Sequence, residues 1–359
     1  MRVLIVDTCY PAFLASHYRS NPGLERRSYD EQWRALMDTF FGTGDSYSHY
    51  LRELGHEAHE VVVNAEPLQR AWAKEHGRRR NLLSRPRRGA NPELLLAQVD
   101  SFEPDVVYMQ HLSFFPPDTL RALRTGSRLL VGQIASELPG NDHLSQFDLI
   151  LTSFPHYVTR LRSLDLASEY LKLAFDPRVL ERLGRTFPRH EAVFVGNLGR
   201  TQHARGNDLL ERAAERVPIE FWGYKLDDRS PESPLASRYR GEAWGLDMYR
   251  VLAEARIAVN RHIDVAENNA NNMRLYEATG AGSLLLTDQK QNLGELFDVG
   301  SEVVAYRDEE ELVQAIEHYL TREDERQEVA AAGQRRTLRD HSFSVRMREL
   351  ADILRSYLR

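Results

Sequence analysis

Apolar residues come in short runs along the chain, and loops and amphipathic stretches separate the runs. Runs such as VLIV and LLV are continuous rather than alternating. That pattern is typical of strands buried on both faces, as in a parallel sheet covered by helices. In the first half the runs predict strands at residues 2–7, 58–63, 105–110, 128–134, 148–152 and, as a sixth, 169–173. Helical spacing between them at 31–41, 47–54, 92–102 and 117–123 indicates a doubly wound α/β domain.

The pattern lapses at residues 176–190, where Pro177 and Pro188 bracket a basic stretch that we expect to be a helix-poor connection. It then resumes and predicts a second α/β domain. The expected strands are 192–195, 219–222, 257–260, 283–287 and 302–306, and the expected helices are 207–216, 246–256, 273–279, 309–320 and 324–339. The fold class predicted is therefore α/β, with two doubly wound Rossmann-like domains, 1–176 and 186–340, facing each other across a cleft.

Composition narrows the class of protein. Hydrophobic residues make up 42% and charged residues 28% of the chain, which is ordinary for a globular protein. A net charge of −6 argues against a nucleic-acid binder that works by bulk charge. The single cysteine, Cys9, excludes an internal disulfide and fits a reducing compartment. No signal peptide and no apolar stretch of about 20 residues stands out, so we expect a cytoplasmic protein.

The segment NNANNMRLYEATGAGSLLLTD, residues 268–288, places four asparagines before a short helix that leads into a buried strand. If Asn272 caps this helix, the free amides of Met273, Arg274 and Leu275 form an anion pocket at the positive end of the helix dipole. Arg274 adds a cationic fork suited to a diphosphate.

One turn further along the same helix, the carboxylate of Glu277 is placed to accept hydrogen bonds from the paired hydroxyls of a ribose. The side chains of Asn269 and Asn271, with Asn272, supply neutral donors and acceptors around a diphosphate and a sugar. The alternative is a solvated loop with one capping residue.

Five motifs follow one another in the second half: VGNLGRTQHARGNDLL, IEFWGYK, LAEARIAVNRH, NNMRLYEATGAG and ELFDVGSEVVAYRDEEELVQAI. In this order they resemble group-1 glycosyltransferases of the GT-B fold, and most of all their CgeB-like (spore-maturation-type) branch. The resemblance implies transfer of a sugar from a nucleotide-diphosphate sugar to an acceptor hydroxyl, with retained anomeric configuration and without a metal. It also implies that the apolar stripe of residues 344–359 forms a helix that crosses back onto the first domain.

The same resemblance assigns residues. Gly199, Arg200 and Arg205 follow a strand after which the family places basic residues that neutralise the leaving diphosphate; a solvated basic turn is the alternative. The family carries a second glutamate eight positions before the ribose-binding one, and this chain has Asn269 there. Glu277 is therefore carried over, and a glutamate that contacts the donor sugar is not.

In the first domain, loops after the strands are expected to face the cleft. Two of these loops contain candidate catalytic residues. His111 is a candidate general base or contact to the donor sugar, and Glu137 is a candidate for orienting the acceptor hydroxyl. Both are equally compatible with loop residues that satisfy backbone groups. Many group-1 enzymes have a Gly-Gly pair after the first strand, and this chain lacks one.

No Asp-x-Asp and no His/Glu pair at helical spacing stands out, so we expect neither a metal nor a cofactor beside the nucleotide sugar. Residues 76–88, HGRRRNLLSRPRR, hold six arginines. They indicate either a solvated loop or a docking surface for an acidic acceptor or the inner membrane face, and no nucleic-acid partner.

Two other functions remain open at this stage. A sugar-nucleotide epimerase on the same fold would need acidic and basic residues lining one closed pocket. A non-enzymatic sugar-binding sensor would normally carry a signal peptide or a DNA-binding segment. A dehydrogenase is disfavoured because no G-x-G-x-x-G follows the first strand.

Overall fold

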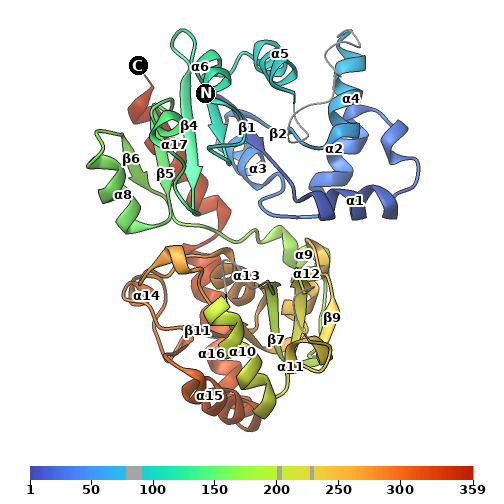
Figure 1. Cartoon of the computed structure of the whole chain (residues 1–359), viewed down its shortest axis with the longest axis vertical. Helices are drawn as coiled ribbons and strands as arrows, with labels where there is room; N and C mark the ends of the chain where they lie inside the picture. The colour runs from blue at the N-terminus through green and yellow to red at the C-terminus, as the bar shows by residue number, and fades with distance from the viewer. Residues whose placement is uncertain (78–90, 200–203, 227–229, 359) are drawn as a thin grey trace. The chain divides into compact units, whose positions relative to one another are not determined.

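The structure is a computed structural model, and it describes residues 1–77, 91–199, 204–226 and 230–358. The chain divides into two compact units: Met1–Leu171 together with Met347–Arg359, and Lys172–Arg346. Figure 1 follows the chain through both units from the blue N-terminus to the red C-terminus. The sequence assigned residues 1–176 and 186–340 to the two domains and residues 344–359 to the helix that joins the first.

The first unit is built on a parallel six-stranded sheet with the strand order β2-β1-β3-β4-β5-β6. Its strands are β1 (Arg2–Asp7), β2 (Glu57–Val62), β3 (Val106–Met109), β4 (Leu129–Ile134), β5 (Leu149–Thr152) and β6 (Ser168–Tyr170). Its helices are α1 (Pro11–Ser20), α2 (Tyr29–Met37), α3 (Ser46–Glu53), α4 (Glu66–Glu75), α5 (Pro92–Phe102), α6 (Pro117–Leu123), α7 (Asn141–Leu144) and α8 (Pro155–Arg162), with the 3₁₀ helix η1 (Leu24–Arg26).

The second unit repeats this plan with the strand order β12-β11-β10-β7-β8-β9, again parallel. Its strands are β7 (His190–Asn197), β8 (Ile219–Tyr224), β9 (Tyr239–Gly241), β10 (Ala255–Asn260), β11 (Leu284–Asp288) and β12 (Val304–Tyr306). Its helices are α9 (Arg178–Leu183), α10 (Ala204–Arg216), α11 (Pro234–Ser237), α12 (Leu246–Ala253), α13 (Met273–Ala281), α14 (Leu293–Leu296), α15 (Glu309–Thr321) and α16 (Glu323–Asp340), with the 3₁₀ helix η4 (Asp264–Ala266).

Each sheet reverses its direction of winding at one place. In the first sheet β1 and β3 are neighbours, and in the second sheet β7 and β10 are neighbours. Loops after such a pair leave toward opposite faces of the sheet, which opens a crevice at the carboxyl ends of the two strands. This is where α/β proteins bind ligands.

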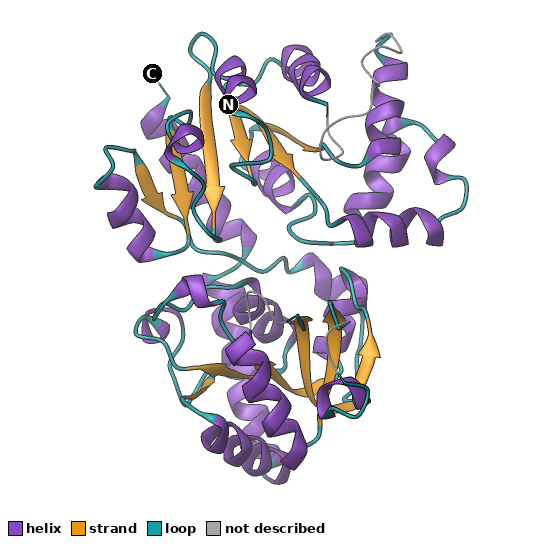
Figure 2. Cartoon of the chain, in the orientation of Figure 1, coloured by secondary structure: helices purple, strands orange, loops and turns teal. Residues whose placement is uncertain are grey.

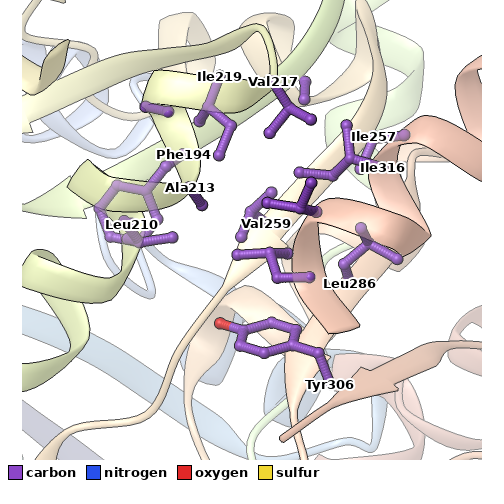
Figure 3. Packing of buried hydrophobic residues seen from close by; sticks show 14 of the residues in the cluster. Phe194, Leu210, Ala213, Val217, Ile219, Ile257, Val259, Leu286, Tyr306 and Ile316 are labelled. Atoms are coloured by element: carbon purple, nitrogen blue, oxygen red, sulfur yellow. The ribbon is translucent and has the colours of Figure 1, made fainter. Parts of the chain in front are cut away.

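A hydrophobic core cluster of the second unit is shown in Figure 3. Aliphatic side chains of the strands, among them Ile219, Ile257 and Val259, pack against Leu210 of α10 and Ile316 of α15, and all of them are buried. The hydroxyl of Tyr306 donates to the backbone oxygen of Asn260 at 2.7 Å, so the polar end of this buried ring is satisfied.

The last helix, α17 (Phe343–Tyr357), returns the chain to the first unit, to which residues from Met347 onward belong. The side chains of Met347, Leu350 and Leu354 are completely buried. Near its end, the hydroxyl of Tyr357 donates to Glu169 at 3.0 Å.

The predicted α/β class with two parallel, doubly wound sheets is confirmed (Figure 2). The expected helix-poor connection at 176–190 is wrong, because it contains α9. This helix begins directly after Pro177, and Val179 and Leu183, one turn apart, are buried. Helix α10 also begins earlier than predicted, at Ala204.

Within the described part of the chain, no helix has the length and apolar character needed to cross a membrane.

Candidate functional site

The N-terminus of α13 lies beside the carboxyl ends of β10 and β11. Asn272 caps the helix as predicted, because its side-chain oxygen accepts from the amide of Leu275 at 3.2 Å. Its side-chain nitrogen donates to the Asn260 side chain at 2.8 Å and to the Arg261 carbonyl at 3.0 Å. The amide of Leu275 is thus used by the cap and does not belong to the predicted anion pocket. The amides of Met273 and Arg274 lie in the first turn of α13. In that turn the helix backbone provides no hydrogen-bond acceptor for them.

Glu277 and Arg274, both predicted to hold the donor, form an ion pair of 2.8 Å, and both side chains are mostly buried. The Tyr249 hydroxyl on α12 also hydrogen-bonds the Glu277 carboxyl. Burial raises the pKa of Glu277, while Arg274 and then Tyr249 oppose that rise. A carboxylate offers about four lone-pair sites. Glu277 therefore keeps acceptor capacity for a diol beyond its two protein partners.

Arg261, the residue after β10, is a buried cation with neutral groups among its partners. Its guanidinium donates to the side-chain oxygen of Asn207 at 3.1 Å and to the backbone oxygen of Asn197 at 3.0 Å, and it lies over the ring of Phe194. A Cβ added at Gly206 would come within 2.2 Å of the Arg261 Cδ, so this glycine leaves room for the arginine against α10. Arg261 thereby joins the carboxyl ends of β7 and β10 at the switch point.

His262 follows Arg261 and pairs with Asp288 at the end of β11. Its Nδ1 lies 2.6 Å from the Asp288 Oδ1, and its amide donates to the same oxygen at 3.0 Å. Lys290 Nζ lies 3.2 Å from the Asp288 Oδ2 and donates to the Glu267 carbonyl at 2.9 Å. Burial pushes the pKa of Asp288 upward, but the His262 hydrogen bond and the Lys290 charge outweigh it, and the net pKa is lowered.

The other predicted asparagines are buried in the loop before α13. The Asn269 side-chain oxygen accepts from Gln291 at 3.1 Å, and the backbone of Ala270 is held by the side chain of Asn292. Asn271 is 4% exposed. These contacts order the loop against the segment after β11. The roles of Asn269 and Asn271 toward a ligand stay predictions.

In the basic cluster after β7, hydrogen bonds with two asparagine side chains hold the backbone of Gly199. Its amide donates to the Asn197 side chain at 2.9 Å, and its carbonyl accepts from Asn207 at 2.7 Å. Arg200 lies outside the described residues. Arg205 is part of α10, and its side chain is also outside the description.

The first unit places His111 after β3 and Glu137 after β4, on neighbouring strands of its sheet. Both residues are exposed, and the His111 ring meets Phe114 edge-on at 5.7 Å. Since β3 borders the switch point of this sheet, His111 lies where a ligand-binding loop is expected. Both catalytic assignments stay predictions.

Of the arginine-rich segment 76–88, residues 78–88 lie outside the described residues. Among the described residues, no three His, Cys, Asp or Glu side chains are grouped as metal ligands would be. Metal independence stays a prediction.

Sequence reasoning missed Tyr249, Arg261, His262, Asp288 and Lys290. Arg261 and His262 follow directly on β10, and Asp288 is the last residue of β11. The rule that ligands bind at the carboxyl ends of parallel strands would have selected all three. No local signal marks Tyr249, since only the packing of α12 on α13 brings it to Glu277.

The profile of a family described as "Glycosyl transferase-like" matches residues 200–352. No curated protein matches the sequence.

Several solved structures share the whole fold. HepE of Anabaena, solved in complex with UDP and glucose, has a TM-score of 0.62 at 13% identity, over 99% of this chain and 100% of that chain. Sucrose-phosphate synthase of Thermosynechococcus elongatus has a TM-score of 0.59 at 10% identity, over 99% and 98%. A glycosyltransferase of Rickettsia africae has a TM-score of 0.60 at 11% identity, over 100% and 98%. The fold is therefore that of GT-B glycosyltransferases.

Proposed function

We propose that this protein is a glycosyltransferase that moves a sugar from a nucleotide-diphosphate sugar to an acceptor hydroxyl. One observation carries the proposal: buried or half-buried cations, open helix amides and a buried carboxylate gather around the carboxyl ends of β7, β10 and β11. Arg261 and Lys290 with the α13 amides suit a diphosphate, and Glu277 suits the ribose diol. The HepE structures, which hold UDP or UDP-glucose in the same fold, support this reading.

In this reaction these residues would stabilise the leaving group. Negative charge grows on the diphosphate as the glycosidic bond breaks, and fixed positive groups lower the energy of that state more than that of the bound substrate. The α13 amides are fixed in direction by the Asn272 cap. In the retaining course that we propose, the acceptor attacks on the face that the diphosphate leaves, and the departing phosphate helps to take the acceptor's proton.

We assign the acceptor side to the first unit, with His111 as general base or sugar contact and Glu137 orienting the acceptor hydroxyl. No metal takes part in this scheme, because arginines and helix amides supply the charge. We also propose the CgeB-like branch as the family subgroup and the cytoplasm as the location, with residues 76–88 available to an anionic acceptor or membrane surface.

A thermal-shift panel of nucleoside diphosphates and their sugars tests the donor class. A ligand present at 100 times its Kd stabilises the folded state by about 2.7 kcal/mol. The nucleotide whose base the site accepts should therefore raise the melting temperature more than the others do. The proposal is wrong if no nucleotide raises the melting temperature.

Product analysis with the selected donor then separates the alternatives. We expect release of the nucleoside diphosphate, a product with retained anomeric configuration by NMR, and a rate unchanged by EDTA. Conversion of the donor to a stereoisomer without release of the nucleotide would instead identify an epimerase. Binding of free sugar without turnover would favour a sensor.

A further inference from the structure

The pair formed by His262 and Asp288 leaves one polar atom unused. The His262 side chain is 0% exposed, and its Nδ1 is 2.6 Å from Asp288. Across the part of the chain that is described, its Nε2 is buried and has no hydrogen-bond partner. Buried polar atoms are rarely left in this condition, and a ligand that met Nε2 would remove it.

The geometry fixes which ring nitrogen is available. Asp288 accepts from the His262 amide and lies beside Lys290, and its lowered pKa keeps it ionised. An ionised carboxylate only accepts hydrogen bonds, so the hydrogen is on Nδ1. Nε2 then carries a lone pair in the neutral ring and an N–H when the ring takes up a proton.

The charges around this ring favour an anion. Arg261 directly precedes His262, and Lys290 lies 3.2 Å from the Asp288 carboxylate that the ring binds. Burial raises the pKa of Tyr306, the neighbouring phenol on β12, well above its ordinary value, so it stays neutral. Asp264 on η4 is the next acidic residue along the chain. His262 directly follows Arg261, whose carbonyl accepts a hydrogen bond from the Asn272 side chain at the start of α13.

We propose that His262 is a phosphate-binding residue of the donor site. When the nucleotide binds, the ring takes a proton from solvent, and Nε2 donates a hydrogen bond to the diphosphate while Asp288 holds the Nδ1 hydrogen. This inference rests on the proposed function, because it names the diphosphate as the ligand. Since Nε2 is closed to solvent in the structure, the residues that cover it must shift to admit the ligand.

The predicted signature is uptake of protons on binding. Calorimetry of UDP binding to the full chain at pH 7.5, in two buffers of different ionisation enthalpy, measures the protons exchanged per UDP. We expect the wild-type protein to take up as much as about one proton more than His262→Gln does. We also expect His262→Gln to bind UDP about tenfold more weakly, since it loses a charged hydrogen bond.

His190 gives a matched control. It forms a histidine–carboxylate pair of 2.6 Å with Glu220, in the same unit but at the start of β7. His190→Gln should keep both the proton uptake and the affinity of the wild type. If His262→Gln does not fold, the test is made on the wild type by NMR with ¹⁵N-labelled imidazole, where UDP should protonate Nε2 of His262.

Three results would overturn the inference. Equal proton uptake and equal UDP affinity in wild type and His262→Gln would exclude a phosphate-binding role for His262. The proposed function of the protein would remain intact. An effect on a UDP-sugar without an effect on UDP would show that Nε2 accepts from a sugar hydroxyl instead. Failure of UDP and of every other nucleoside diphosphate to bind would overturn the proposed function as well.

Discussion

At the scale of single residues, burial decides what a charged side chain can do. Glu277 is 5% exposed, and its ion pair with Arg274 and its bond with Tyr249 leave neither charge alone in the interior. The same contacts fix the direction of the carboxylate before any ligand arrives. A residue held in this way contributes to stability, and under the proposed function it also binds the ribose.

We therefore expect Glu277→Gln to affect both properties. The amide cannot accept from ribose hydroxyls as strongly as a carboxylate, so UDP affinity should fall at least about tenfold. Arg274 would lose its buried anion, and unfolding free energy should fall by about 1–3 kcal/mol. Calorimetry and urea unfolding measure the two effects.

Tyr249→Phe is the matched control for Glu277. It keeps the carboxylate and removes one donor to it, so UDP affinity should fall less than in Glu277→Gln. Unchanged UDP affinity in Glu277→Gln would reject the ribose role.

Glu60 on β2 gives a prediction on pH. It is 2% exposed and accepts from the amide of Ser48 at 2.7 Å, and burial raises its pKa from 4.5 to about 8. Between these two pH values the folded state holds a proton that the unfolded state has lost. The free energy of unfolding should therefore decrease as the pH rises from about 4.5 to about 8, by roughly 2–5 kcal/mol.

Glu60→Gln removes this titration. The variant should lose that part of the pH dependence and become more stable than the wild type above about pH 8. Urea midpoints from pH 5 to 9 measure it. Parallel curves for the two proteins would contradict the prediction.

At the scale of elements, α13 links the cap to the site. Asn272 accepts from the Leu275 amide and also binds Asn260 and Arg261, so it orders both the helix start and the end of β10. Asn272→Ala should reduce stability by about 1–2 kcal/mol and also weaken UDP binding, because the amides lose their fixed direction.

Asn91 is a matched control for this element. It caps α5 in the other unit by accepting from the amides of Glu93 and Leu94. Asn91→Ala should lower the melting temperature to a similar extent and leave UDP affinity unchanged. If Asn272→Ala behaves in the same way, the cap is structural only.

At the scale of the whole molecule, the chain leaves the first unit after Leu171 and re-enters it at Met347. The first unit is therefore completed by the last residues of the sequence. Met347, Leu350 and Leu354 are fully buried there, and each such side chain contributes about 1.5–3 kcal/mol.

A chain that ends at Arg346 should expose the apolar surface that α17 covers. We expect a lower melting temperature, aggregation on size-exclusion chromatography and loss of transferase activity. Tyr357→Phe, which removes only the bond to Glu169, should cost less than about 1 kcal/mol. A truncated protein that stays monodisperse with an unchanged melting temperature would show that α17 is dispensable.

Local pattern in the sequence determined the elements. The continuous apolar runs located the strands because burial on both faces requires them, and Asn272 marked the start of α13 because a cap acts within a few residues. The failure at α9 has the same origin. Its basic residues resembled a linker, and its two buried positions are too few for a clear periodicity.

Tertiary structure alone decided which side chains meet. His262 and Asp288 are 26 residues apart, Arg261 and Asn207 are 54 apart, and Tyr357 and Glu169 are 188 apart. Each pair forms because parallel strands end at one edge of a sheet or because a distant helix packs beside it, and no local pattern encodes such a meeting. The sequence therefore indicated a diphosphate site at the start of α13 and a ribose contact at Glu277, whereas the fold showed that Arg274 and Glu277 form an ion pair and that Asn272 binds the Arg261 carbonyl.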